Sequence, residues 1–134
     1  MGLDVGSRTI GVAVSDPLGY TAQGLDTIRR KNKRHDLSAL HRIIRDYGVR
    51  QIVVGYPLRM HGEAGVQAER VAEFAEQLRE RFELPVHLRD ERLTTVQAQR
   101  VLREAEVSIE KRARAVDRMA AVLILQSFLD SRSQ

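Results

Sequence analysis

The sequence predicts an α/β domain with a mixed five-stranded sheet, in which three antiparallel strands come first, parallel strands follow, and helices cover both faces. The first observation is a pair of short segments, 2–5 and 9–15, in which small and β-branched residues alternate around a glycine turn at Gly6. The second is that helical spacing alternates with short apolar runs after residue 36, as in chains that build parallel strands. The third is the length of 134 residues, which suits one core and not two lobes, so we expect a single domain over 1–134.

The first half of the chain is expected to form three strands, a helix and a fourth strand. Turn chemistry at 16–19, with a proline and a glycine, leads into a third strand at 21–28. Asp36 is placed to cap a helix with apolar residues at helical spacing, and Gly48 is placed to end it. The apolar run at 51–55 then predicts a parallel strand that is covered on both faces.

The second half predicts further helices around a fifth strand. Apolar residues at helical spacing in 71–82 predict a long amphipathic helix, and the fifth strand is expected at 86–90. A threonine at position 94 or 95 is placed to cap the next helix, and the charged segment 104–114 is expected to be a mobile connection. A last helix at about 115–129 is apolar on most faces and is expected to be largely buried.

The composition limits both the chemistry and the partners of the chain. The absence of cysteine excludes disulfides, thiolate metal sites and a cysteine nucleophile. The absence of tryptophan and the few other aromatic residues argue against binding single strands chiefly by base stacking. With no apolar run long enough to cross a bilayer and no recognisable signal peptide, we expect a cytoplasmic protein. The formal charge of +4 and the pI of about 10 favour polyanions such as nucleic acids as partners.

Positive charge is concentrated in two segments of the chain. A solvated surface explains any one of these cations, but together they suit a partner with a phosphate backbone. We therefore expect contacts to phosphate from within these segments. They consist of Arg29, Arg30, Lys31, Lys33 and Arg34, and of Lys111, Arg112 and Arg114 beside Glu110.

Acidic residues stand where a catalytic site could form. Asp4 ends the first strand and Asp90 and Glu91 end the fifth, at the kind of sheet edge where α/β proteins bind ligands. Asp117 precedes Ala121 by one helical turn, and alanines at this spacing let a helix lie close to a sheet. Each acid alone is as readily explained by a salt bridge or a helix cap.

Three carboxylates brought together, however, would raise one another's pKa values by repulsion, which divalent metal ions would relieve. All-oxygen ligands favour Mg²⁺ or Mn²⁺, and two such ions would stabilise in-line displacement at phosphorus.

Four segments carry a resemblance to a known family. They are Asp4-Val-Gly-Ser-Arg-Thr-Ile-Gly-Val-Ala-Val-Ser-Asp16, Val53-Val-Gly-Tyr-Pro-Leu58, Asp90-Glu-Arg-Leu-Thr-Thr95 and Asp117-Arg-Met-Ala-Ala121. In their order and spacing, across nearly the whole chain, these motifs resemble the YqgF (RuvX) family, which is similar to Holliday-junction resolvases of the RNase H-like fold. The resemblance implies a metal-dependent nuclease that trims the 5′ end of precursor 16S ribosomal RNA during ribosome biogenesis, or that cleaves branched DNA.

The resemblance also implies roles for individual residues. Asp4, Glu91 and Asp117 are expected to be the catalytic residues and the ligands of a two-metal site that holds Mg²⁺ or Mn²⁺. Structured RNA or branched DNA is the expected partner, and a homodimer would suit a four-way junction, which needs paired cuts. The residues that the resemblance leads us to expect at the substrate are Arg8, at the family's basic position in the first hairpin, and Arg92 and Thr94, in the fifth-strand motif. Lys111 and Arg112 are added to them as phosphate contacts from the second basic segment, independently of the resemblance.

Two departures from the family, and two other function classes, stay open at this point. The chain begins at Met1-Gly2 where the family has several apolar residues, which implies a short central strand or a start further upstream. Arg118 stands where the family often has a small or apolar residue, so it either contacts phosphate or faces solvent. The motif Asp4-x-Gly6 also occurs in actin-like and sugar-kinase ATPases, but those need a second lobe that this length does not provide. A non-catalytic nucleic-acid-binding module on the same fold would keep the basic loops and would not need three acids.

Overall fold

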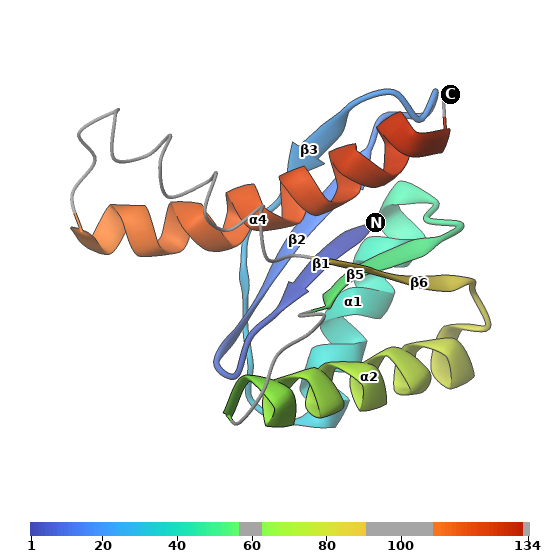
Figure 1. The fold of residues 1–134 in the computed structure, drawn as a ribbon. Coiled ribbons are helices and arrows are strands. Elements are labelled where there is room, and N and C mark those ends of the chain that lie inside the picture. The colour runs from blue at the N-terminus through green and yellow to red at the C-terminus, as the bar shows by residue number, and fades with distance from the viewer. Residues whose placement is uncertain (57–62, 91–108, 133–134) are drawn as a thin grey trace.

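A computed structural model describes residues 1–56, 63–90 and 109–132, which form a central sheet with helices on both sides (Figure 1). This arrangement confirms the predicted α/β class. The elements in chain order are β1 (Gly2–Val5), β2 (Thr9–Ser15), β3 (Ala22–Gly24), β4 (Ile28–Arg29), α1 (Lys33–Tyr47), β5 (Ile52–Tyr56), α2 (Glu63–Phe82), β6 (Val86–Asp90) and α4 (Ile109–Arg132).

The sheet is mixed, with the strand order β3-β2-β1-β5-β6 and with β4 also paired to β2. β1 is antiparallel to β2 and parallel to β5, and β5 is parallel to β6. The predicted order of antiparallel strands followed by parallel ones is therefore confirmed. Within the described residues the sheet has six strands rather than five, because the strand expected at 21–28 is divided into β3 and β4.

A one-residue bulge causes this division of the edge strand. Ala13 pairs with Gly24 and Ile10 pairs with Ile28, so two residues of β2 lie opposite three residues of its neighbour. The unmatched residue interrupts the ladder of hydrogen bonds. Asp26, in the middle of the three, has a fully exposed side chain.

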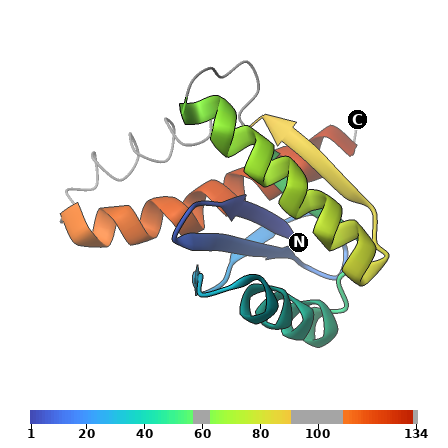
Figure 2. The ribbon, with the colours of Figure 1, turned by 90° about the horizontal axis from the view of Figure 1, so that it is seen from below.

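Side chains of the strands alternate between two separate cores. The helices α1 and α2 cover one face of the sheet, and α4 covers the other face (Figures 1 and 2). Leu3 and Val5 of β1 lie in the larger core, against α1 and α2. Ala13 and Val53 lie in the smaller core, against α4. The expectation of helices on both faces is therefore confirmed.

The start of α1 differs from the prediction. Its N-cap is Asn32, whose side-chain oxygen accepts a hydrogen bond from the backbone N–H of His35 at 2.8 Å. The prediction that Asp36 caps this helix was wrong, because Asp36 lies inside the first turn with its side chain buried. Gly48 ends the helix as predicted, with a φ of 62° in the left-handed region that favours glycine.

Helix α4 begins earlier than predicted. It starts at Ile109, so the second part of the segment 104–114, expected to be a mobile connection, is helical. Glu, Lys, Arg and Ala are strong helix formers, and they extend a helix here without an apolar stripe.

The helix expected after position 94 lies outside the described residues. None of the helices in the described ranges has the length and apolar content to cross a bilayer. Among the described side chains of α4, those that are buried are Ala120, Ala121, Ile124 and Leu125, so the helix buries one face and is less buried than predicted.

Candidate active site

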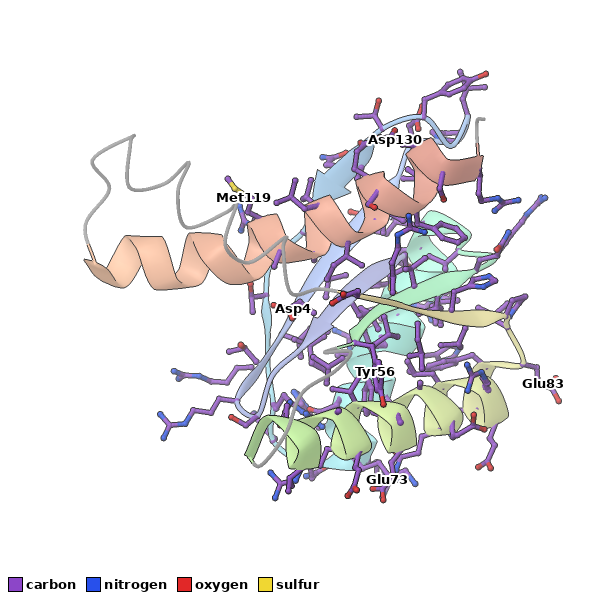
Figure 3. The ribbon with its side chains drawn as sticks, in the orientation of Figure 1. Asp4, Tyr56, Glu73, Glu83, Met119 and Asp130 are labelled. Carbon is purple, nitrogen blue, oxygen red and sulfur yellow. The ribbon has the colours of Figure 1, made fainter. Side chains whose placement is uncertain are left out.

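Asp4 lies on the face of the sheet that α4 covers, near the carboxyl end of β1. Because side chains alternate along a strand, Asp4 shares a face with Gly2 and not with the core residue Leu3. Gly2 faces α4 closely: a Cβ added to it would lie 2.7 Å from the Cβ of Leu125. Figure 3 shows Asp4 beneath α4, and its side chain is half-buried. The first predicted acid is thus enclosed between sheet and helix.

The positions beside Asp4 have no side chains. Gly11 lies directly opposite Asp4 in β2. On the other side, Leu3 pairs with Val54 of β5, and the next residue of that strand is Gly55. Neither glycine can cover the carboxylate from the side, so a cation or a phosphate group can approach it along the sheet.

The direction of α4 brings its amino-terminal half toward Asp4. The side chain of Gln126 accepts a hydrogen bond from the backbone N–H of Ala22 at 2.9 Å, at the start of β3. Beyond the end of β3, Arg118 donates to Asp26 at 3.0 Å. The helix therefore runs opposite to β3, and also opposite to β1, since both strands are antiparallel to β2.

Asp117 lies in this half of α4. Ala121 packs over Gly2, since its carbonyl oxygen would lie 3.0 Å from a Cβ added there. Position 117 precedes Ala121 by one helical turn, and the helix runs opposite to β1, so its backbone lies toward Asp4. Only the backbone of Asp117 is described. The helix is thus in the predicted place, and the predicted meeting of the two carboxylates stays a prediction.

At the end of β6 the alternation of side chains assigns Asp90 to one face of the sheet. Arg89 donates to the hydroxyl of Ser127 in α4 at 3.1 Å, so Arg89 faces α4. Asp90 pairs with Tyr56 of β5 and, by alternation, belongs to the opposite face. Glu91 lies outside the described residues.

The other predicted site residues are described to different extents. Arg8 is exposed in the turn between β1 and β2. Lys111 and Arg112 lie in α4, and their side chains are not among those described. Arg92 and Thr94 lie outside the described residues. Among the side chains described, no group of three or more His, Cys, Asp or Glu is placed to hold a metal ion, and two of the three predicted ligands are not in this set. The chemistry of the predicted set, carboxylate oxygens throughout, fits Mg²⁺ or Mn²⁺.

Arg118 is about half exposed and lies against the bulged edge of the sheet. Its aliphatic stem lies across Gly24, where an added Cβ would be 2.6 Å from Cγ of Arg118. Its guanidinium donates to Asp26 in the bulge. This cation therefore contacts the bulged edge of the sheet through an exposed ion pair, which adds little to the stability of the fold.

Sequence reasoning missed a buried ion pair behind the β1–β2 turn. Arg30 Nε donates to Oδ2 of Asp36 at 3.0 Å, and the Asp36 side chain is 2% exposed. The same guanidinium donates to the carbonyl of Gly6 at 2.8 Å and lies over the ring of Phe74, 5.2 Å from its centroid. Arg30 thus fixes the turn that follows Asp4 to both α1 and α2. The sequence showed a basic residue close to Asp36, but the position of Phe74 against this pair comes from the tertiary fold.

With this geometry in place, the fold can be compared with solved structures. RuvC of T. thermophilus, solved in complex with a Holliday junction substrate, superimposes with a TM-score of 0.56 over 98% of this chain and 93% of the RuvC chain. The sequence identity is 14%, so this likeness shows the fold alone. The protein is therefore an α/β protein of the RNase H-like class, with an acidic residue near the end of its first strand.

Sequence comparison identifies the family. The profile of the RuvX family, described as Holliday junction resolvase, matches residues 1–131, and the chain belongs to this family. A protein of Koribacter versatilis named "Putative pre-16S rRNA nuclease" is 58% identical over 132 residues, covering 98% of this chain and 86% of the relative. A protein of Moorella thermoacetica with the same name is 57% identical over 134 residues, covering 100% of this chain and 96% of the relative.

Proposed function

We propose that the protein is a metal-dependent nuclease that hydrolyses phosphodiester bonds. Its substrate is the 5′ end of precursor 16S ribosomal RNA, branched DNA of the Holliday-junction type, or both. The position of Asp4 beneath α4, in a chain of the RuvX family, is the observation that carries the proposal. The names of the curated relatives favour the RNA substrate, and the junction bound to RuvC favours branched DNA.

We assign the catalytic role and metal binding to Asp4, Glu91 and Asp117. The carboxylate of Asp4 is held on the α4 face by the strand, and Asp117 is on the part of α4 that lies toward it. Because Asp90 belongs to the opposite face, the alternation favours Glu91 as the acid contributed by this end of the sheet. Mg²⁺ or Mn²⁺ held by the three carboxylates would act as a Lewis acid that stabilises the charge developing at phosphorus.

Basic and hydroxyl side chains around these acids would hold the nucleic acid. Arg8 is exposed in the turn that follows β1, and Lys111 and Arg112 belong to the amino-terminal half of α4. Arg92 and Thr94 follow Glu91 closely in the chain. Contacts of this kind position a phosphate backbone and carry no sequence information, so the protein should select substrates by structure. We further propose action in the cytoplasm, with two copies acting together where a four-way junction needs paired cuts.

The test is cleavage of a structured precursor-rRNA leader and of a four-way DNA junction in the presence of Mn²⁺. Asp4→Asn, Glu91→Gln and Asp117→Asn should each lower the cleavage rate by at least about 100-fold, because a metal ligand contributes several kcal/mol to transition-state stabilisation. Asp130→Asn is the matched control, since Asp130 is an exposed carboxylate on the same helix, bonded to Gln126. It should cleave like the unmodified protein.

Two results would contradict the proposal. Full activity in the three acid variants would remove the assigned roles. Tight, metal-independent binding without turnover by the unmodified protein would instead support a nucleic-acid-binding module on the same fold, whose affinity would fall steeply with salt.

A further inference from the structure

A cavity of about 410 Å³ lies on the face of the sheet opposite to Asp4. It opens between the β1–β2 turn, the start of α1 and the middle of α2 (residues 67–77), and Figures 1 and 2 show these three segments close together. Val5 lines it, and Val5 is the neighbour of Asp4 that points to the other side of β1. The volume is in the range of sites that bind small ligands or single chemical groups.

The lining of the cavity is basic. Arg30, Lys31, Lys33 and Arg70 contribute cations, and Asp36 and Glu73 contribute carboxylates. Asp36 is already neutralised by its ion pair with Arg30. The lining therefore has three further cations, Lys31, Lys33 and Arg70, and one further carboxylate, Glu73. Within the described residues no acidic oxygen lies within 4 Å of the charged groups of these three cations. This excess of positive charge favours an anionic ligand.

Hydrogen bonds hold the walls of the cavity in place. Arg30 joins the Gly6 carbonyl to Asp36, and the side-chain amide of Gln67 donates to the carbonyl of Val5 at 3.1 Å. The turn and both helices are therefore fixed relative to one another without a ligand. A guanidinium has five N–H donors, and these bonds use two of those on Arg30, so the others can serve a phosphate.

We propose that this cavity binds a backbone phosphate of the nucleic acid whose neighbouring segment reaches Asp4. Asp4 and Val5 are consecutive residues on opposite faces of β1, and the turn with Ser7 and Arg8 lies just beyond them. A strand that crosses this turn can therefore place one phosphate in the cavity and another near the acids. The inference rests on the proposed function for the identity of the ligand. Its binding step requires neither metal nor cleavage.

The experiment measures binding of a labelled RNA hairpin and a labelled four-way DNA junction to the full chain without divalent ions, by fluorescence anisotropy over a series of salt concentrations. The variant Lys31→Gln/Lys33→Gln/Arg70→Gln removes three cations of the cavity lining that have no acidic oxygen within 4 Å among the described residues. The matched control, Arg42→Gln/Arg50→Gln/Arg81→Gln, removes three exposed cations near the far ends of α1 and α2 and before β5. Both variants change the net charge equally.

We expect the cavity variant to bind the nucleic acids about tenfold more weakly or worse. The slope of log affinity against log salt should also fall by about one for each phosphate that the variant no longer binds. The control should keep the slope of the unmodified protein. Equal slopes in the two variants would overturn the proposal. Asp4→Asn should bind the labelled nucleic acids normally without divalent ions and fail to cleave them when Mn²⁺ is added. Loss of cleavage therefore tests the proposed function, and weakened binding by the cavity variant tests the phosphate site separately.

Two further titrations identify the source of the phosphate and test the fold. Inorganic phosphate and adenosine monophosphate are titrated while backbone amide shifts of Ser7, Lys33 and Gln67 are recorded, in the unmodified protein and in the cavity variant. Weak binding of these probes and tight binding of the oligonucleotide would support a backbone phosphate. Tighter binding of a free phosphate than of the oligonucleotide would show a small-molecule site instead and overturn the proposal. Equal Tm values for the two triple variants exclude unfolding as the cause.

Discussion

Gly2 of β1 and Leu125 of α4 approach each other so closely that no side chain fits between strand and helix. A Cβ added to Gly2 would lie 2.7 Å from the Cβ of Leu125 and 3.0 Å from the carbonyl oxygen of Ala121. Both obstacles are fixed to the helix backbone and cannot rotate away. This contact sets the distance of α4 from the strand that carries Asp4.

Gly2→Ala should therefore destabilise the fold by about 2 kcal/mol, because the extra methyl group forces α4 away from the sheet. Urea unfolding followed by circular dichroism measures the loss. Gly24→Ala is the comparison: its added Cβ would meet Cγ of Arg118 at 2.6 Å and Cγ2 of Val122 at 3.2 Å, and rotation about the Cα–Cβ bonds can displace both atoms at the expense of the exposed Arg118–Asp26 ion pair. Its cost should be smaller, about 1 kcal/mol. Equal losses in the two variants would show that the close approach at Gly2 does not determine the packing of α4.

Arg30→Met should cost about 3 kcal/mol of unfolding free energy, because it leaves the buried carboxylate of Asp36 without its cation. The double variant Arg30→Met/Asp36→Leu should lose less than the sum of the single variants, with a coupling energy of about 1.5 kcal/mol or more. The pair Arg45–Asp46 is the comparison, since both side chains are more than half exposed. Breaking it should change stability by less than about 0.5 kcal/mol. Additive losses at Arg30 and Asp36 would contradict the proposed coupling.

Asn32→Ala should destabilise the protein by about 1 kcal/mol, since it removes the oxygen that accepts from the N–H of His35 at the start of α1. Asn32→Asp keeps an oxygen at the same place and should retain most of the stability. Thermal unfolding of the three proteins at one pH measures both effects. Asp36 would instead be supported as the cap if Asp36→Ala lost as much stability as Asn32→Ala while Arg30→Met lost none.

Asp16 should make the stability depend on acid pH. Its Oδ1 accepts from the backbone N–H groups of Thr21 at 2.9 Å and Tyr20 at 2.7 Å, and chiefly the Thr21 bond lowers the pKa of Asp16 from its ordinary value of 3.8. A carboxyl group whose pKa is lowered by folding stabilises the fold above its unfolded pKa, and this contribution is lost as the pH falls through the lowered pKa. Asp16→Asn should therefore lower the urea midpoint at neutral pH and match the unmodified protein in strong acid.

Asp46→Asn is the matched control for this pH series. It removes one exposed carboxylate from α1, and its weak ion pair with Arg45 should leave the midpoint almost unchanged at either pH. A difference between Asp16→Asn and the unmodified protein that stayed constant in acid would show that the charge of Asp16 is not responsible.

Local patterns predicted much of the fold. The alternation around Gly6 predicted the hairpin of β1 and β2, and helical spacing predicted α2 and the buried side of α4. The bulge was not predictable in this way, because its place depends on the register of this edge with β2, which the residues of the edge do not determine alone. The same limit applies to the cap of α1. Asn32 and Asp36 both suit a cap, and the burial of Asp36 with Arg30 decides between them.

The candidate site was predicted in part for similar reasons. The end of the first strand and the spacing of Asp117 from Ala121 are local properties, so the position of Asp4 in β1 and the close approach of α4 to the sheet were predicted from the sequence. The basic cavity does not, because its walls come from the β1–β2 turn, α1 and α2, and it needs the tertiary arrangement. Arg70 and Gln67 gave no signal as binding residues, since on an amphipathic helix they read as ordinary polar positions.

The bulge between β3 and β4 also protects the protein from unwanted aggregation. An open sheet margin with a regular backbone invites another polypeptide to add itself as a further strand. Here the margin is broken by an unmatched residue, and the exposed charge of Asp26 stands at the break with Arg118 of α4 bound to it. Strand addition along this margin is therefore disfavoured.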